Sequence, residues 1–105
     1  MLVKKSNVVA NDIVTMRLIN GEEIIAKLIS DDEHAYMVGS PQSLVQTDKG
    51  VGLSKSMLTG DDDQGVEILK SSVMMIGPTA ELMSNQYTKL TTGIEVVSRQ
   101  KKIVV

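Results

Sequence analysis

The chain has 105 residues, no cysteine and a formal net charge of −2, from 11 lysines and arginines against 13 aspartates and glutamates. This length suits one domain, and without cysteine neither a disulfide framework nor a thiolate metal site can form. The acidic balance argues against a uniformly basic nucleic-acid binder, so any such role needs locally gathered positive charge. A cysteine-free composition is typical of an intracellular protein, and we expect a cytoplasmic location.

The sequence also lacks the patterns of a membrane or secreted protein. No apolar run approaches the roughly 20 residues that a membrane-spanning helix needs. The N-terminal residues have two lysines but no long apolar run, so we expect no signal peptide and no membrane partner.

The clearest pattern in the chain lies in residues 14–36 and predicts a β-hairpin. Apolar and polar residues alternate over residues 14–18, and Ile24, Ala26 and Leu28 alternate with Glu23, Ile25 and Lys27. This period of two is typical of strands with one buried face. Asn20-Gly21 lies between them and predicts a type I′ turn, which requires positive φ at both central positions.

Further strands are expected at residues 35–38 and 43–47, 51–58, 66–69 and 73–76. Pro41 cannot donate a ladder hydrogen bond, so the third strand is expected to bend, or to lie at a sheet edge, at that position. The clearest loop is residues 59–65. The last two segments form either one bent strand or two short ones.

After Gly77-Pro78 the apolar residues recur at spacings of three and four, which predicts a helix over about residues 79–92 with Thr79 as its cap. A C-terminal extension, residues 93–105, follows. Five short strands and one terminal helix predict a mainly β fold: a small, strongly bent five-stranded antiparallel sheet or partly open barrel with a C-terminal helix.

The hairpin resembles the first motif of the Sm/LSm (Hfq-related) family, Leu-x-x-Gly-x-x-apolar-x-Gly-x-Leu followed by Asp-x-(aromatic or His)-Met-Asn. The residues that carry the resemblance are Leu18, Gly21, Ile24, Ala26, Leu28, Asp32 and His34. Ala26 replaces the mid-strand glycine, and Ala35-Tyr36 replaces the Met-Asn pair. The second motif, apolar-Arg-Gly, is at best residues 75–78, so the base-reading Asn and the Arg are both absent. In the family the helix usually precedes the first strand, whereas the helix expected here follows the last strand.

The resemblance implies a single Sm-like domain over residues 1–105 and a homo-oligomeric ring of identical subunits. In such a ring the fourth strand of one subunit pairs with the last strand of its neighbour. Physical chemistry gives an independent reason to expect association. Residues 73–76 are continuously apolar, and an open edge of this kind is an aggregation hazard that closed symmetry removes.

The candidate nucleic-acid-binding residues are Asp32, His34, Tyr36, Lys101 and Lys102. His34 either stacks on or hydrogen-bonds to a base, or is a solvated turn histidine. Tyr36 either offers a stacking face or is a half-buried strand residue, and Asp32 either holds the loop through backbone hydrogen bonds or is an ordinary turn aspartate. Lys101 and Lys102 either contact phosphates or belong to a solvated basic tail.

Catalytic and metal chemistry find little support in the sequence. The run Asp61-Asp62-Asp63 departs from a calcium loop, because Gly65 falls at the fifth position and Ser72 at the twelfth. One histidine and no cysteine leave no nucleophile–base pair, so we expect neither an enzyme nor a cofactor.

Two function classes therefore remain. The first is a ring-forming Sm-like protein that binds single-stranded RNA or DNA and has a role in RNA processing. The second is an oligomeric structural or adaptor protein that keeps the fold without binding nucleic acid. His34, Tyr36 and Asp32 favour the first class, which we prefer, whereas the acidic balance and the missing motif residues favour the second.

Overall fold

The computed structural model describes residues 7–92, apart from the side chain of residue 63, and has six strands, two short 3₁₀ helices and one α-helix. The strands are β1 (Ile13–Leu18), β2 (Glu23–Asp31), β3 (Ala35–Thr47), β4 (Gly50–Lys55), β5 (Val66–Leu69) and β6 (Val73–Pro78). The helices are η1 (Asp62–Gln64), η2 (Lys70–Ser72) and α1 (Glu81–Thr92). The fold is therefore mainly β with a C-terminal helix, as predicted. No helix in the described part is long and apolar enough to cross a membrane.

The strands form one antiparallel sheet in the order β4-β3-β2-β1-β6. The long strand β3 has two neighbours on one side, because its first part pairs with β5 and its second part with β4. The two final segments are thus separate short strands joined by η2, and the sheet has six strands where five were expected. Within the described residues, β4 and β6 lie at the two ends of the strand order.

The β1–β2 hairpin has the predicted strands but a different turn. Val14 lies opposite Ala26 and Met16 opposite Ile24. Gly21 has φ +93°, whereas Asn20 is not in the positive-φ region, so the prediction of a type I′ turn is wrong. The Leu18 carbonyl accepts the Gly21 N–H at 2.9 Å, and the Leu18 N–H donates to the carbonyl of Glu22 at 2.8 Å. This is the longer hairpin loop, in which a type I turn is followed by a left-handed glycine.

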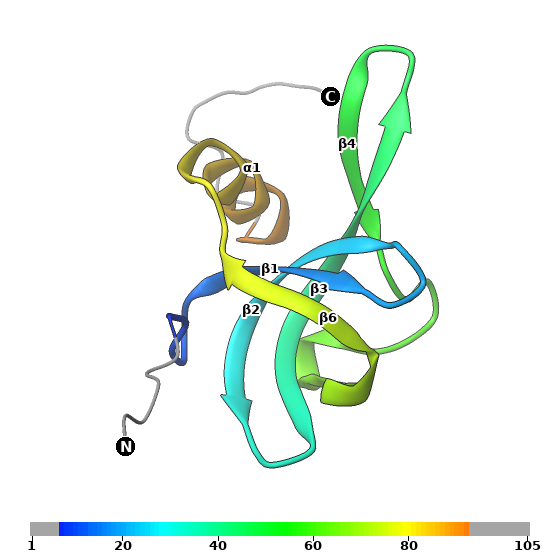
Figure 1. The fold of residues 1–105 in the computed structure, drawn as a ribbon. Helices are drawn as coiled ribbons and strands as arrows, with labels where there is room; N and C mark the ends of the chain where they lie inside the picture. The colour runs from blue at the N-terminus through cyan, green and yellow to red at the C-terminus, as the bar shows by residue number, and fades with distance from the viewer. Residues whose placement is uncertain (1–6, 93–105) are drawn as a thin grey trace.

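The bend predicted at Pro41 lies within β3, which curves through the fold in Figure 1. Ser40 has φ +48°. The pairing with β2 skips between Gly39, opposite Lys27, and Gln42, opposite Ile25. Such an irregularity bends a strand and re-aims the side chains that follow it.

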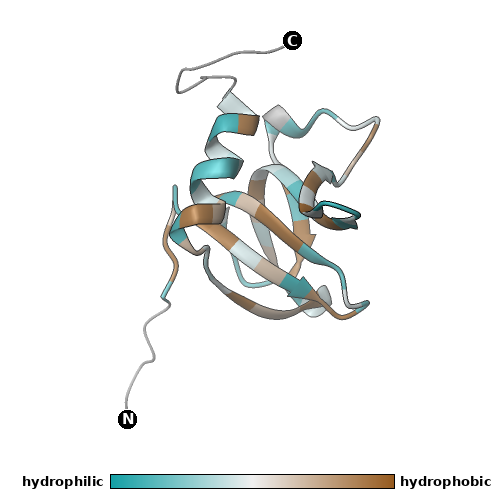
Figure 2. Cartoon of the chain, turned by 90° about the horizontal axis from the view of Figure 1, so that it is seen from above, coloured by the Kyte–Doolittle hydropathy of each residue, from teal (hydrophilic) through white to brown (hydrophobic). Residues whose placement is uncertain are grey.

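The core forms where the bent sheet folds over itself, and β1 and β6 cross β2 and β3 in Figure 1. Its buried members are Val8, Val14, Met16, Ile24, Ala26, Leu28 and Val38. Val66 and Ile68 from β5 and Val73 and Ile76 from β6 pack against this cluster. Figure 2 shows the corresponding alternation of hydrophobic and hydrophilic positions along the strands. Strands β5 and β6, which pair with β3 and β1 respectively, thus share one core.

Helix α1 confirms the predicted helix but begins later than expected. Ala80 supplies the first helical carbonyl, which accepts the Ser84 N–H at 2.8 Å. The Thr79 hydroxyl is 2.8 Å from the hydroxyl of Thr15 on β1. The prediction that Thr79 caps the helix is therefore wrong, because its hydroxyl is engaged with the sheet.

Tyr87 attaches α1 to the bend of β3. Its side chain is buried, and its hydroxyl oxygen lies 3.0 Å from the carbonyl oxygen of Gly39 and 2.9 Å from that of Ser40. Burial raises the pKa of Tyr87 to about 12, because the charged phenolate is disfavoured away from water. The predicted C-terminal extension lies outside the described residues.

Candidate nucleic-acid interface

Two connections far apart in the sequence meet at one end of the sheet. The turn between β2 and β3 contains Asp32 and His34, and η2 begins at Lys70. The Lys70 N–H donates a hydrogen bond of 2.8 Å to the His34 carbonyl, and β5 pairs with the start of β3 directly after this turn. We call the surface formed by residues 31–36, Glu67 and Lys70 the rim.

Asp32 holds the backbone of the rim. One of its carboxylate oxygens accepts the N–H groups of His34 at 2.8 Å and Ala35 at 2.9 Å. Hydrogen bonds to the ionised form stabilise it, so these two backbone donors, first that of His34 and then that of Ala35, lower the pKa of Asp32. The loop-holding role considered for Asp32 is therefore what this geometry provides.

His34 projects its ring into solvent at the tip of the rim. Its side chain is 83% exposed, and its Nε2 lies 3.8 Å from a carboxylate oxygen of the equally exposed Glu33. An exposed ring on a tightly held backbone offers a face on which a base can stack. The exposure and the neighbouring carboxylate are equally those of a solvated turn histidine, so both alternatives for His34 stay open.

Tyr36 is half-buried and packs against the core cluster. The Lys70 ammonium lies 5.0 Å from the centre of its ring, within the range of a cation–π contact. The same ammonium donates a hydrogen bond of 2.9 Å to Asp31, and this bond raises the pKa of Lys70. Tyr36 therefore serves mainly as a support for Lys70, and less of its ring is open for stacking than that of His34.

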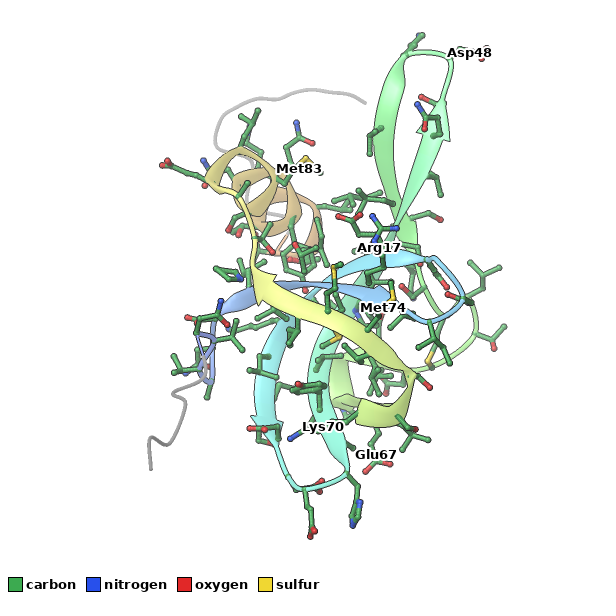
Figure 3. The ribbon with its side chains drawn as sticks, viewed as in Figure 1. Arg17, Asp48, Glu67, Lys70, Met74 and Met83 are labelled. Atoms are coloured by element: carbon green, nitrogen blue, oxygen red, sulfur yellow. The ribbon has the colours of Figure 1, made fainter. Side chains whose placement is uncertain are left out.

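Lys70 is the rim residue that the sequence analysis missed. The resemblance pointed to an arginine in a second motif at residues 75–78, whereas the cation at the rim comes from residue 70. A local feature could have identified it, because Lys70 is the charged residue between the two apolar segments of β5 and β6. Figure 3 shows Lys70 and Glu67 at the same end of the molecule.

The rim is acidic overall, because it contains Asp31, Asp32, Glu33 and Glu67 beside one lysine, Lys70, which pairs with Asp31. A cavity of about 70 Å³ lies among them, lined by Ser30, Asp31, Asp32, Ala35, Met37 and Glu67. These charges repel phosphates, so the described rim can contact bases more readily than the backbone of a nucleic acid. Lys101 and Lys102, expected as phosphate contacts, lie outside the described residues.

The two ends of the sheet form a second candidate surface. On β6, Met74 is 55% and Met75 is 61% exposed, and Val51 is exposed on β4. A groove of about 360 Å³ runs beside β6 and is lined by Thr15, Arg17, Glu23, Met75, Ile76, Gly77 and Pro78. Two of the lining residues, Arg17 and Glu23, form an ion pair at 2.8 Å, and Arg17 lies opposite Met75 in the pairing of β1 with β6. Apolar side chains on a strand at the end of a sheet are suited to strand pairing with another chain.

Among the side chains that the structure describes, no group of three or more histidines, cysteines or acidic residues could hold a metal ion. Comparison with models of known protein families gives no match, and comparison with curated proteins gives none either.

Proposed function

We propose that this protein forms Sm-like homo-oligomeric rings whose rims bind the bases of single-stranded RNA or DNA. The proposal is supported mainly by one observation: the β2–β3 turn lies against η2. The backbone N–H of Lys70 joins the two by a hydrogen bond to the carbonyl of His34. The Sm/LSm resemblance places base contacts in the first of these connections. Lys70 supplies a cation beside it, in a chain that lacks the arginine of the family's second motif.

Assembly would join β4 of one subunit to β6 of the next. Both strands lie at the ends of the described strand order, and both expose apolar side chains. Because two different strands meet, the contact is head-to-tail and closes into a ring when the rotation between subunits permits it. Each subunit would then present its rim to a common centre or face.

The rim would take bases through stacking on His34 and a polar contact from Lys70. Stacking on an aromatic ring contributes roughly 1–3 kcal/mol per base and tolerates different sequences. Because Lys70 is paired with Asp31 and the rim is acidic, the rim itself would release few counterions, so the salt-dependent part of binding would fall to Lys101 and Lys102. A role in RNA processing and a cytoplasmic location are part of this proposal.

One observation favours the second function class, an oligomeric adaptor without nucleic-acid binding. The rim contains four carboxylates, those of Asp31, Asp32, Glu33 and Glu67, and the ammonium of Lys70 is paired with Asp31. An adaptor of this kind would keep the ring and use the acidic rim to contact a basic protein.

The test combines assembly and binding measurements on the full chain. Light scattering gives the oligomeric state, and fluorescence anisotropy with oligo-U, oligo-A and single-stranded DNA at two salt concentrations gives binding. We expect an oligomer that binds at least one of these strands at low salt. A monomer at micromolar concentration contradicts the ring, and an oligomer that binds none of the strands favours the adaptor.

A further inference from the structure

A polar cavity of about 290 Å³ lies between α1 and the bend of β3, away from the rim. Its lining comes from β3, β4, η1 and α1, through Ser40, Gln42, Lys55, Asp62, Leu90 and Thr91. A second hollow of about 330 Å³ shares Ser40, Asp62 and Thr91 with it and continues beneath the helix past Tyr87. No residue of the rim lines either space.

Two polar side chains that line this cavity are unusually buried. Gln42 is 6% exposed, and its side-chain amide makes no hydrogen bond with any residue that the structure describes. Asp62 is 8% exposed, and its carboxylate lies 4.0 Å from the Lys55 ammonium, longer than a direct hydrogen bond. Buried polar groups are normally hydrogen-bonded, so the cavity favours a ligand that supplies hydrogen-bond partners to Gln42 and Asp62.

The charges of the lining narrow the choice of ligand. Lys55 and Asp62 carry opposite charges, and the other lining residues are neutral, so an ionic ligand would leave a charge uncompensated. The ligand must both donate hydrogen bonds, to the Asp62 carboxylate, and accept them, from Lys55 or the Gln42 amide. Leu90 adds an apolar surface that suits the face of a planar ring.

We propose that this cavity binds a guanine base. The Watson–Crick edge of guanine carries two adjacent N–H donors beside one carbonyl acceptor, and proteins read unstacked bases by hydrogen bonds to this edge. The Asp62 carboxylate accepts the two donors, and Lys55 and Gln42 donate to the carbonyl. Adenine fits less well, because its ring nitrogen on the same edge is an acceptor and would face the carboxylate.

This binding is independent of the rim, and the base has two possible sources. It could belong to a free guanine nucleoside or nucleotide, or to a guanine within a single strand. The probes for the first source are guanosine and guanosine monophosphate. The probe for the second is a uridine tract with one central guanine, compared with the same tract without it.

The experiment is a titration of the full chain with guanosine, inosine and adenosine, followed by amide chemical shifts and calorimetry. Inosine lacks the exocyclic amine and so loses one hydrogen bond to a carboxylate, which we expect to weaken binding roughly tenfold. Adenosine should bind more weakly still. Shifts should gather on the cavity residues of β3, η1 and α1.

Variants assign the binding to the cavity. Asp62→Asn should weaken guanosine binding at least tenfold and reduce the preference over inosine, whereas Glu81→Gln, an exposed charge in the first turn of α1, should change neither. If Asp62→Asn does not fold, Lys55→Met tests the same edge, because Lys55 is partly exposed. Equal binding of the nucleosides, or no binding at millimolar guanosine, overturns the proposal. His34→Ala should leave guanosine binding unchanged. A failure of guanosine binding can therefore be distinguished from a failure of single-strand binding at the rim.

Discussion

The backbone N–H of Lys70 donates a 2.8 Å hydrogen bond to the carbonyl of His34 and thereby joins the β5–β6 connection to the β2–β3 turn. The side chain of Lys70 then reaches back to Asp31 at 2.9 Å and lies over the ring of Tyr36. One residue thus holds together both parts of the rim.

Replacing Lys70 by Met should weaken binding of oligo-U several-fold while the midpoint of urea unfolding changes little. The variant removes the ammonium at the rim but keeps the backbone hydrogen bond to His34, and exposed ion pairs contribute little to stability. Fluorescence anisotropy and urea titration measure the two effects. Lys49→Met, at the turn between β3 and β4, is the matched control and should bind as the wild type does.

His34→Ala should cost roughly 1–3 kcal/mol of binding free energy for a single strand, because the exposed ring is the stacking face. Stability should be nearly unchanged, since the side chain is 83% exposed.

Tyr36→Ala should instead lower the free energy of unfolding by about 2 kcal/mol, because Tyr36 packs against the core cluster. Anisotropy and urea unfolding of both variants separate the two roles. A His34 variant that binds as the wild type does would move the site away from the rim.

Proline substitutions at Met74 and Met75 should have different effects. Successive residues of an antiparallel strand direct their N–H groups to opposite sides, so one proline removes a bond to β1 and the other a bond at the outer edge. We expect one variant to lose stability and the other to stay folded but dissociate. Light scattering and thermal unfolding distinguish them. Leu58→Pro, in the loop after β4, is the control, and assembly that survives both β6 prolines excludes this edge.

Asp32 should make the folded state sensitive to acid. Its pKa is lowered in the folded protein, so its contribution to stability is present above the unfolded pKa of about 3.9 and is lost as the pH falls through the lower folded value. Asp32→Asn keeps an acceptor oxygen for the turn but does not titrate. Urea unfolding at pH 7 and at pH 3 should show a smaller difference for Asp32→Asn than for the wild type.

Tyr87→Phe should lower the free energy of unfolding by about 1–2 kcal/mol, because the Gly39 and Ser40 carbonyls lose a buried donor. The pKa of Tyr87 is raised to about 12. Its stabilising effect is therefore complete below the ordinary tyrosine value of about 10 and is lost as the pH rises toward the folded value. The free energy of unfolding, measured with urea between neutral and alkaline pH, should fall less steeply with pH for Tyr87→Phe than for the wild type. Equal slopes for the two proteins would contradict the buried hydroxyl.

The sequence by itself determined the features that depend on neighbouring residues. Alternation over residues 14–18 sets the face of β1, and apolar spacing after Gly77-Pro78 predicts α1. These patterns act through local backbone preferences and one buried face, so they can be read without knowing what covers that face. The bend at Pro41 has the same local origin.

Tertiary structure alone decided which side chains meet across the bent sheet. Strict alternation placed Ile25 on the face opposite Ile24, yet both are buried. Lys70 reaches Tyr36 because β5 pairs with the start of β3, and Gln42 shares a cavity with Asp62, 20 residues further along the chain. Such contacts depend on how strands that are far apart in the sequence are arranged in space. A local pattern of polar and apolar residues does not reveal that arrangement.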